Sequence, residues 1–238
     1  MNRQAQAAVL FLLGASLLHA GTTDLYLRYV KAGLQPLLLA SGAILVITAL
    51  ATAWYEWRLP KTPGRHRDQH PEPRISWLLL LPLLALILVA PPALGSYSAT
   101  RTGTALQEPV AYPALPATDP LPLGVADYAG RAVYDHGRTL TGRRIALTGF
   151  VALDRDGTPY LVRMALNCCA ADAQPVKVGL TGRIPPVLQP DTWLQVTGTY
   201  TARLARDPVN DGPIPFIEVA TARPVATPRD PYDETWND

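Results

Sequence analysis

The chain has 238 residues, which is enough for one ordinary soluble domain and a membrane region. Its 21 basic and 19 acidic residues leave a formal net charge of +2, so it lacks the strong positive field typical of nucleic-acid-binding proteins. We therefore expect no nucleic-acid partner. Only two cysteines occur, Cys168 and Cys169, and because they are adjacent they cannot build a disulfide framework.

Three apolar segments precede residue 100, at about 5–23, 34–54 and 76–95. A helix of about 20 apolar residues crosses a bilayer, so residues 1–100 are predicted to be a transmembrane region in contact with lipid. The first segment is the weakest of the three, and a cleaved signal peptide is its alternative interpretation. We favour a retained span because another span follows and the apolar run has no sharp end.

The loop between the second and third spans predicts the orientation of the chain. Short loops rich in basic residues stay on the cytoplasmic side of a membrane. This loop carries five: Arg58, Lys61, Arg65, Arg67 and Arg74. The chain is therefore predicted to be a multi-pass protein of the cell membrane with an extracytoplasmic C-terminal domain. His66 and His70 in this loop have helical metal-ligand spacing, but the neighbouring prolines favour a solvated loop.

Small residues within the first two spans would let another helix approach closely: Gly14, Ser16, Ala40, Ser41, Gly42 and Ala43. None of the three spans carries a buried acidic residue, a set of paired charges or an internal repeat from which a transport path is made. The chain alone is therefore a poor candidate for a pore.

The remainder of the chain is predicted to be an all-β soluble domain. Residues 101–121 indicate a Pro/Ala/Thr-rich linker, and residues 125–133 repeat apolar positions at helical spacing, which predicts a short helix ending near Gly137. Five β-branched or aromatic runs follow, the first two joined by a turn at 154–157. We expect residues 122–228 to form a small five-stranded OB-like barrel with one preceding helix, and 229–238 to be a tail. Lys177 and Arg163 are too few basic residues for a nucleic-acid face.

The segment Asn167–Ala173, with the sequence NCCAADA, contains both thiols of the protein. If the backbone turns there, Cys168, Cys169 and Asp172 could bind zinc or another thiophilic metal, with His136 as a further donor. A strained vicinal disulfide or thiol exchange is the redox alternative. In the third interpretation, one cysteine packs as a small apolar residue, the other fills a tight turn, and Asp172 caps that turn.

The segments LTGFVA, RMALNCCAADAQPVKV, DTWLQVTGTY and TPRDPYD, together with Tyr29-Val30, resemble a bacterial family of small predicted permease subunits encoded beside a larger permease. The resemblance implies a small subunit with an extracytoplasmic domain and a multi-span partner, in systems sometimes linked to metal homeostasis. Matched residue by residue, it points to Cys168, Cys169, Asp172 and Trp193.

We therefore expect a non-enzymatic accessory subunit of a permease, whose outer β-domain binds, delivers or senses a solute or metal ion. The alternative is a membrane-tethered thiol-redox or metal-binding protein that uses the two cysteines, although the Cys-X-X-Cys spacing of thioredoxin-like proteins is missing. The four histidines at 19, 66, 70 and 136 are scattered, and no Ser-His-Asp arrangement, acid pair or phosphate loop supports an enzyme.

Overall fold

A computed structural model of the chain describes residues 3–58, 78, 80–89, 91–109 and 111–234. The chain divides into a helical unit, Met1–Tyr26 with Ala32–Pro92, and a β-rich unit, Leu27–Lys31 with Ala93–Asp238. The short segment between the first two helices thus belongs to the β-rich unit. Most of the predicted cytoplasmic loop, with His66 and His70, lies outside the described residues.

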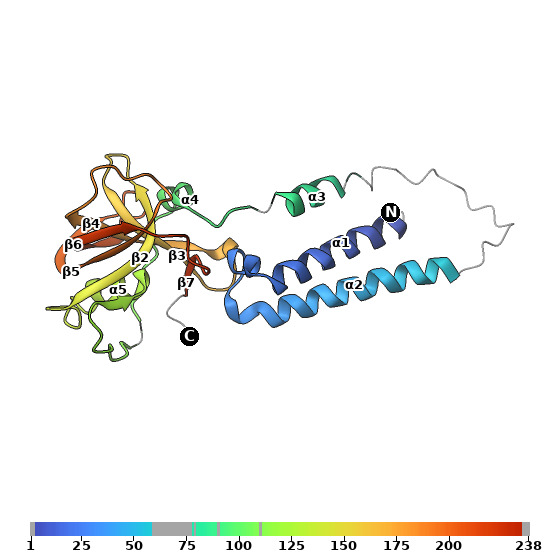
Figure 1. Cartoon of the computed structure of the whole chain (residues 1–238), viewed down its shortest axis with the longest axis horizontal. Helices are drawn as coiled ribbons and strands as arrows, with labels where there is room; N and C mark the ends of the chain where they lie inside the picture. The colour runs from blue at the N-terminus through green and yellow to red at the C-terminus, as the bar shows by residue number, and fades with distance from the viewer. Residues whose placement is uncertain (1–2, 59–77, 79, 90, 110, 235–238) are drawn as a thin grey trace. The chain divides into compact units, whose positions relative to one another are not determined.

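Two antiparallel helices form most of the helical unit, α1 (Arg3–Thr22) and α2 (Gln35–Arg58) (Figure 1). The 3₁₀ turns η1 (Asp24–Arg28) and η2 (Ala32–Leu34) lie between them in the chain. By length and composition, Arg3–Thr22 and Ala32–Arg58 could each cross a membrane. At about 1.5 Å per residue, both exceed or match the roughly 30 Å of a hydrocarbon core.

Glycines let these two helices touch at their backbones. A Cβ atom added to Gly14 would lie 2.8 Å from the carbonyl oxygen of Gly42, and one added to Gly42 would lie 3.0 Å from that of Gly14. The prediction of close helix packing at small residues is confirmed for this pair, and the neighbouring helix comes from the same chain.

The third predicted span contains helix α3 (Leu80–Leu88), which has nine described residues. Residues 91–95 form no helix, and the short α4 (Ser96–Arg101) that follows them already belongs to the β-rich unit. Several other residues of the predicted span 76–95 lie outside the described ranges.

The β-rich unit is built on a closed barrel of five strands: β2 (Arg144–Leu153), β3 (Pro159–Leu166), β4 (Gln174–Gly182), β5 (Trp193–Arg206) and β6 (Pro213–Pro224). Their order is β2-β5-β6-β4-β3, and pairing of β3 with β2 closes the ring (Figure 1). All neighbours are antiparallel except β4 and β6. The predicted five-stranded OB-like barrel is confirmed.

Two short strands extend this barrel. Strand β1 (Leu121–Leu123) runs parallel to β2, and β7 (Tyr232–Glu234) runs parallel to the end of β3. At Gly149 in β2 a Cβ atom would lie 2.7 Å from the Val162 carbonyl oxygen. Glycine there lets β2 and β3 approach closely.

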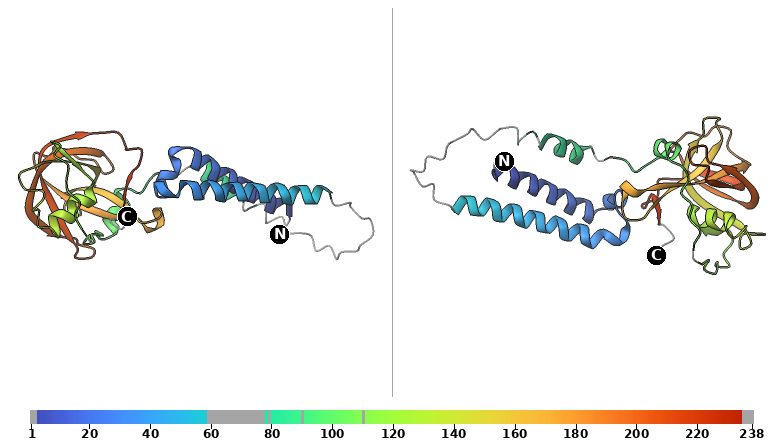
Figure 2. Two further views of the ribbon diagram at one scale, coloured as in Figure 1. Left: turned by 90° about the horizontal axis from the view of Figure 1, so that it is seen from below. Right: turned by 180° about the vertical axis from the view of Figure 1, so that it is seen from behind.

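Helix α5 (Val125–Val133) packs against the barrel core, as the spacing of its apolar residues predicts (Figure 2). Val125, Tyr128 and Ala129 are fully buried, and the Tyr128 hydroxyl donates a 2.6 Å hydrogen bond to the Phe216 carbonyl. The helix therefore covers part of the core instead of standing apart from the barrel.

A second apolar cluster forms on β2 and β3 from side chains that alternate with those of the barrel interior: Phe150, Ala152, Tyr160, Val162, Met164 and Leu166. Ala99 of α4, together with Ala93 and Leu94, packs on this cluster. On the neighbouring β4, the Lys177 ammonium donates to Asp207 Oδ2 at 2.7 Å and to the Thr102 carbonyl at 3.0 Å. In OB-folds the usual ligand face lies on the second and third barrel strands, which are β3 and β4 here. This chain covers that face with its own residues.

The segment 101–121 contains little regular structure, but it packs on the barrel more closely than its composition suggests. Leu106 and Leu115 contact the core, and the fully buried Arg131 of α5 donates to the Pro113 carbonyl at 2.9 Å. Arg131 also pairs with Asp127 at 2.7 Å, so its charge is compensated. Backbone carbonyls of the linker thus supply contacts that its few large apolar residues cannot.

Candidate metal centre

The loop after β3 turns sharply at the two cysteines. Strand β3 ends at Leu166, and Cys169 lies at the start of the 3₁₀ turn η4 (Ala170–Asp172) with an extended backbone, φ −155° and ψ 168°. Adjacent side chains on a straight strand point to opposite faces, whereas here the turn gathers them. The sulfur atoms of Cys168 and Cys169 and a carboxylate oxygen of Asp172 all lie within 4.8 Å of one another.

Asp172 holds this loop through its carboxylate. Its Oδ1 accepts the Asn167 N–H at 3.1 Å and its Oδ2 accepts the Cys168 N–H at 2.9 Å. The Asp172 N–H in turn donates to the Cys169 carbonyl at 3.0 Å. The turn-capping role expected for Asp172 is therefore present, and it also places a carboxylate beside both thiols.

The same contacts set the ionisation of the three groups. The hydrogen bond to the Asp172 carboxylate, followed by the one to Cys169, raises the pKa of Cys168 to about 12. Partial burial raises the pKa of Asp172, but the Cys168 thiol and the surrounding backbone N–H groups outweigh it and hold that pKa below its usual value. At neutral pH the Asp172 carboxylate therefore lies next to a protonated Cys168 thiol.

The donor set fits a thiophilic or borderline metal ion. In a tetrahedral zinc site with Zn–S near 2.3 Å and Zn–O near 2.0 Å, ligand atoms lie about 3.5–3.8 Å apart. That spacing falls within the 4.8 Å limit that encloses the three donor atoms here, and Cys168 is exposed while Cys169 is half-buried. A bound cation would also compensate the charge that keeps the Cys168 thiol protonated.

Thiol exchange, like metal binding, requires a deprotonated thiol. Exchange begins with a thiolate, and the pKa of Cys168 near 12 keeps its thiol protonated at neutral pH. Both cysteines are free in the structure. The raised pKa of Cys168 therefore opposes both roles, and a bound cation would offset it by stabilising the thiolate.

A short segment outside the barrel pairs with this loop. Val30 forms an antiparallel bridge with Cys169, the Lys31 N–H donates to the Cys168 carbonyl at 3.1 Å, and the Ala170 N–H donates to the Tyr29 carbonyl at 2.8 Å. We call Leu27–Lys31 the connecting segment because it lies between α1 and α2. Sequence reasoning gave it no role in the site, although Tyr29-Val30 belongs to the quoted resemblance.

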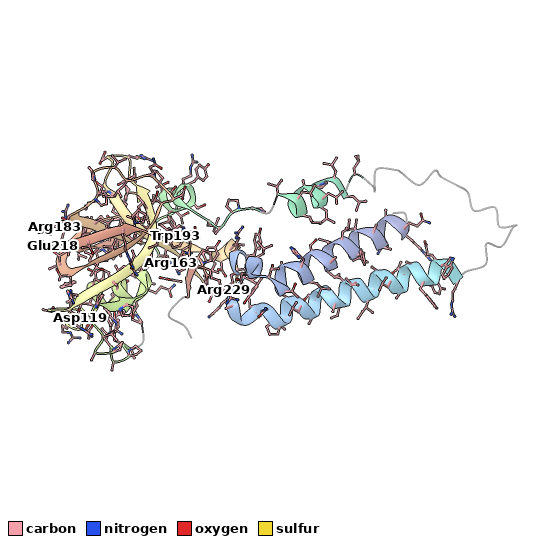
Figure 3. The ribbon with its side chains drawn as sticks, in the orientation of Figure 1. Asp119, Arg163, Arg183, Trp193, Glu218 and Arg229 are labelled. Atoms are coloured by element: carbon pink, nitrogen blue, oxygen red, sulfur yellow. The ribbon has the colours of Figure 1, made fainter. Side chains whose placement is uncertain are left out.

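Trp193 lies elsewhere, at the start of β5. Its ring meets Phe150 edge-on with centroids 5.7 Å apart, and the Arg163 guanidinium lies 5.1 Å from its centroid (Figure 3). Arg163 also pairs with Asp233 of β7 at 2.9 Å. Trp193 thus packs against the arginine that attaches β7 to the barrel, and its contacts indicate a structural role.

His136 does not join the cluster: among the described residues, the candidate metal-ligand group contains Cys168, Cys169 and Asp172. It occupies a left-handed position, φ 51°, after α5, and its carbonyl accepts the Tyr200 hydroxyl at 3.2 Å.

Tyr232, within the TPRDPYD segment, is a residue to which the sequence analysis assigned no role of its own. Its hydroxyl donates to the Arg28 carbonyl of the connecting segment at 3.0 Å.

Comparison with known proteins finds one family model that matches the barrel region. Residues 126–233 match the sequence model of the DUF1980 C-terminal domain, an uncharacterised family, over slightly less than half of the chain. No curated protein and no solved structure matches the chain significantly. The matched range includes the cysteine loop and Tyr232, whereas the connecting segment lies outside it.

Proposed function

We propose that this protein is an accessory membrane subunit of a larger multi-span permease, and that its extracytoplasmic barrel binds a thiophilic metal ion, zinc being the first candidate. The observation that carries the proposal is the placement of two thiols and a carboxylate within 4.8 Å on one loop. Three protein donors leave a tetrahedral ion with a free position, which suits exchange more than permanent structural binding. Delivery or sensing of the ion follows from that openness.

The connecting segment supports the proposed topology. It is paired with the cysteine loop, so the connection between α1 and α2 and the barrel must lie on the same side of a membrane that both helices cross. The chain leaving α2 is then on the opposite side, and it must cross again before it reaches α4. The apolar residues around α3 are the candidate for that third crossing, which agrees with the basic loop being cytoplasmic.

The helices support a subunit role rather than a pore. No Asp, Glu, Lys or Arg lies between Arg3 and Asp24 or between Lys31 and Glu56, so these spans lack the acidic residues and charge pairs that usually line an ion path. The outer face of α2 is apolar, with Leu37, Ile44 and Ile47 each more than 60% exposed. Such a face suits lipid or a partner helix, and a multi-span partner would supply the path.

Metal binding is tested on the full chain in mild detergent by titration with Zn²⁺ against a competing chelator. We expect Cys168→Ser and Cys169→Ser each to weaken binding more than about tenfold, since changes to outer-shell groups alone cost that much. Asp156→Asn, in the exposed turn between β2 and β3, is the matched acidic control and should bind as the wild type does. Equal binding by all forms would refute the site.

Topology and partnership have separate tests. In a chain with both native cysteines changed to serine, Val187→Cys places a thiol on a residue that is 76% exposed on the barrel. A membrane-impermeant maleimide should label it in intact cells if the barrel is extracytoplasmic, and labelling only after lysis would refute that orientation. Purification from the native membrane in mild detergent should recover a multi-span protein with the chain, and recovery of the chain alone would count against the subunit role.

A further inference from the structure

The cysteine loop is supported from two sides, and only one of the supports is local. Asp172, four residues after Cys168, holds the start of the loop through two backbone N–H groups. The connecting segment holds the other side, because the Cys168 carbonyl and the Ala170 N–H are both paired with it. These two contacts flank Cys169, so the backbone that carries the second thiol is fixed by residues about 140 positions earlier in the sequence.

Tyr232 fixes the connecting segment in turn. Its side chain is 4% exposed, and its hydroxyl donates to the Arg28 carbonyl at 3.0 Å while accepting the Leu94 N–H at 3.1 Å. Met164 of β3 is its partner in the parallel pairing of β7, only a few residues before the cysteines. Tyr232 therefore connects three parts of the unit: its backbone pairs with the end of β3, and its buried hydroxyl bonds to the connecting segment and to the chain that enters α4.

We propose that the connecting segment is the second half of the metal centre and that Tyr232 is its positioning residue. The inference rests on the proposed metal binding and adds to it a dependence on Leu27–Lys31. Pairing with this segment restricts the backbone at Cys168 and Cys169, so the thiols are held near each other before the ion arrives. Positioning of ligands before binding strengthens binding because less freedom is lost when the ion is bound. By reciprocity, the bound ion should stabilise the pairing to the same extent.

The first test removes one hydrogen bond of the pairing. Lys31→Pro lacks the N–H that donates to the Cys168 carbonyl, and Lys31→Ala keeps this N–H while removing the same side chain. In the full chain in mild detergent, Lys31→Pro should weaken Zn²⁺ binding by about fivefold or more, the lower end of usual coupling between sites. Lys31→Ala should bind Zn²⁺ as the wild type does, and the melting temperature of the barrel should be the same in both.

The second test uses Tyr232→Phe, which keeps the buried ring and removes the hydroxyl. It should also weaken Zn²⁺ binding by about fivefold or more. Hydrogen exchange provides an independent readout: Zn²⁺ should slow exchange of the Ala170 N–H, which donates to Tyr29, in the wild type and less so in Tyr232→Phe. A purely structural role of the hydroxyl would lower the barrel melting temperature without this metal-dependent difference.

The outcomes separate the two proposals. If Cys168→Ser loses Zn²⁺ while Lys31→Pro and Tyr232→Phe bind it as the wild type does, the metal centre stands and the role of the connecting segment is refuted. If Zn²⁺ leaves exchange at Ala170 unchanged, the coupling is likewise refuted. If the wild-type chain binds no Zn²⁺, both proposals fail together.

Discussion

Breaking the buried ion pair between Lys177 and Asp207 should be among the most destabilising single changes in the β-rich unit. The Lys177 side chain is 5% exposed and that of Asp207 is 0% exposed, with 2.7 Å between Nζ and Oδ2. Asp207 also accepts the N–H groups of Thr104 at 2.8 Å and Val209 at 2.9 Å. Asp207→Asn would leave the ammonium buried beside an uncharged amide, and losing one partner of such a pair costs about 3–5 kcal/mol.

For a domain of this size, about 1 kcal/mol lowers the melting temperature by about 2–4 °C, so Asp207→Asn should lower it by at least about 6 °C. The assay is thermal unfolding of the full chain in mild detergent, followed by the circular dichroism of the β-sheet. Asp211→Asn is the matched control, because the Arg206–Asp211 pair spans 3.8 Å and both side chains are more than 70% exposed. Such exposed pairs contribute about 0–1 kcal/mol, so the control should melt near the wild type.

A double variant separates the effect of leaving Lys177 unpaired from the effect of changing residue 207 itself. Lys177→Met with Asp207→Asn removes both charges together and keeps an amide oxygen that can accept from a backbone N–H, and removing both charges of a buried pair is often neutral or stabilising. It should therefore recover much of the stability that Asp207→Asn loses. A melting temperature for Asp207→Asn equal to that of Asp211→Asn would refute the reasoning, since it would mean that the pair is solvated.

Three further outcomes are expected. Gly198→Ala should destabilise the barrel by about 1–3 kcal/mol in chemical denaturation, because its Cβ would collide with the Glu218 carbonyl oxygen, whereas a Cβ at the control position Gly33 meets no atom within 4 Å. Asp172→Asn should speed alkylation of Cys168 at mildly alkaline pH by more than about tenfold, as measured by mass spectrometry. Losing the carboxylate lowers the pKa of the Cys168 thiol, and a change of one pKa unit is about a tenfold change in the amount of thiolate. An unchanged rate would show that the carboxylate does not control the pKa of this thiol. The folded-state pKa of Asp172 is lowered, so the support that its carboxylate gives the loop is complete above the ordinary carboxyl pKa. This support is lost as the pH falls through the lowered folded-state pKa. The Cys168 N–H should therefore lose its protection from hydrogen exchange in that acidic range and keep it at neutral pH.

The barrel could be predicted because its strands are encoded locally. Alternation around Ile145 and Leu147 gives β2, the turn at 154–157 returns the chain as β3, and the apolar spacing from Val125 gives α5. The turn at the cysteines was also within reach, because Asp172 is a residue type that caps turns. Each of these signals lies within about ten residues of the structure that it specifies.

Contacts between distant segments could not be predicted in this way. Lys177 and Arg163 look from the sequence like surface cations, yet both are buried, because Asp207 and Asp233 compensate their charges. Those partners lie 30 and 70 residues away. The connecting segment likewise looks like a plain link between two spans, since a single β-bridge leaves no periodic pattern in so short a stretch.

Arg28 and Tyr232, whose hydrogen bond supports the thiol loop, are 204 residues apart, so the ribosome makes them at well separated times. Leu27–Lys31 leaves the ribosome about 200 residues before Tyr232, and domains otherwise tend to fold as they emerge. The cysteines therefore gain their full support only after Tyr232 has been made and has bonded to the connecting segment. A chain halted before Tyr232 would carry both thiols on an incompletely supported loop, so the assembled loop marks a chain made at least as far as β7.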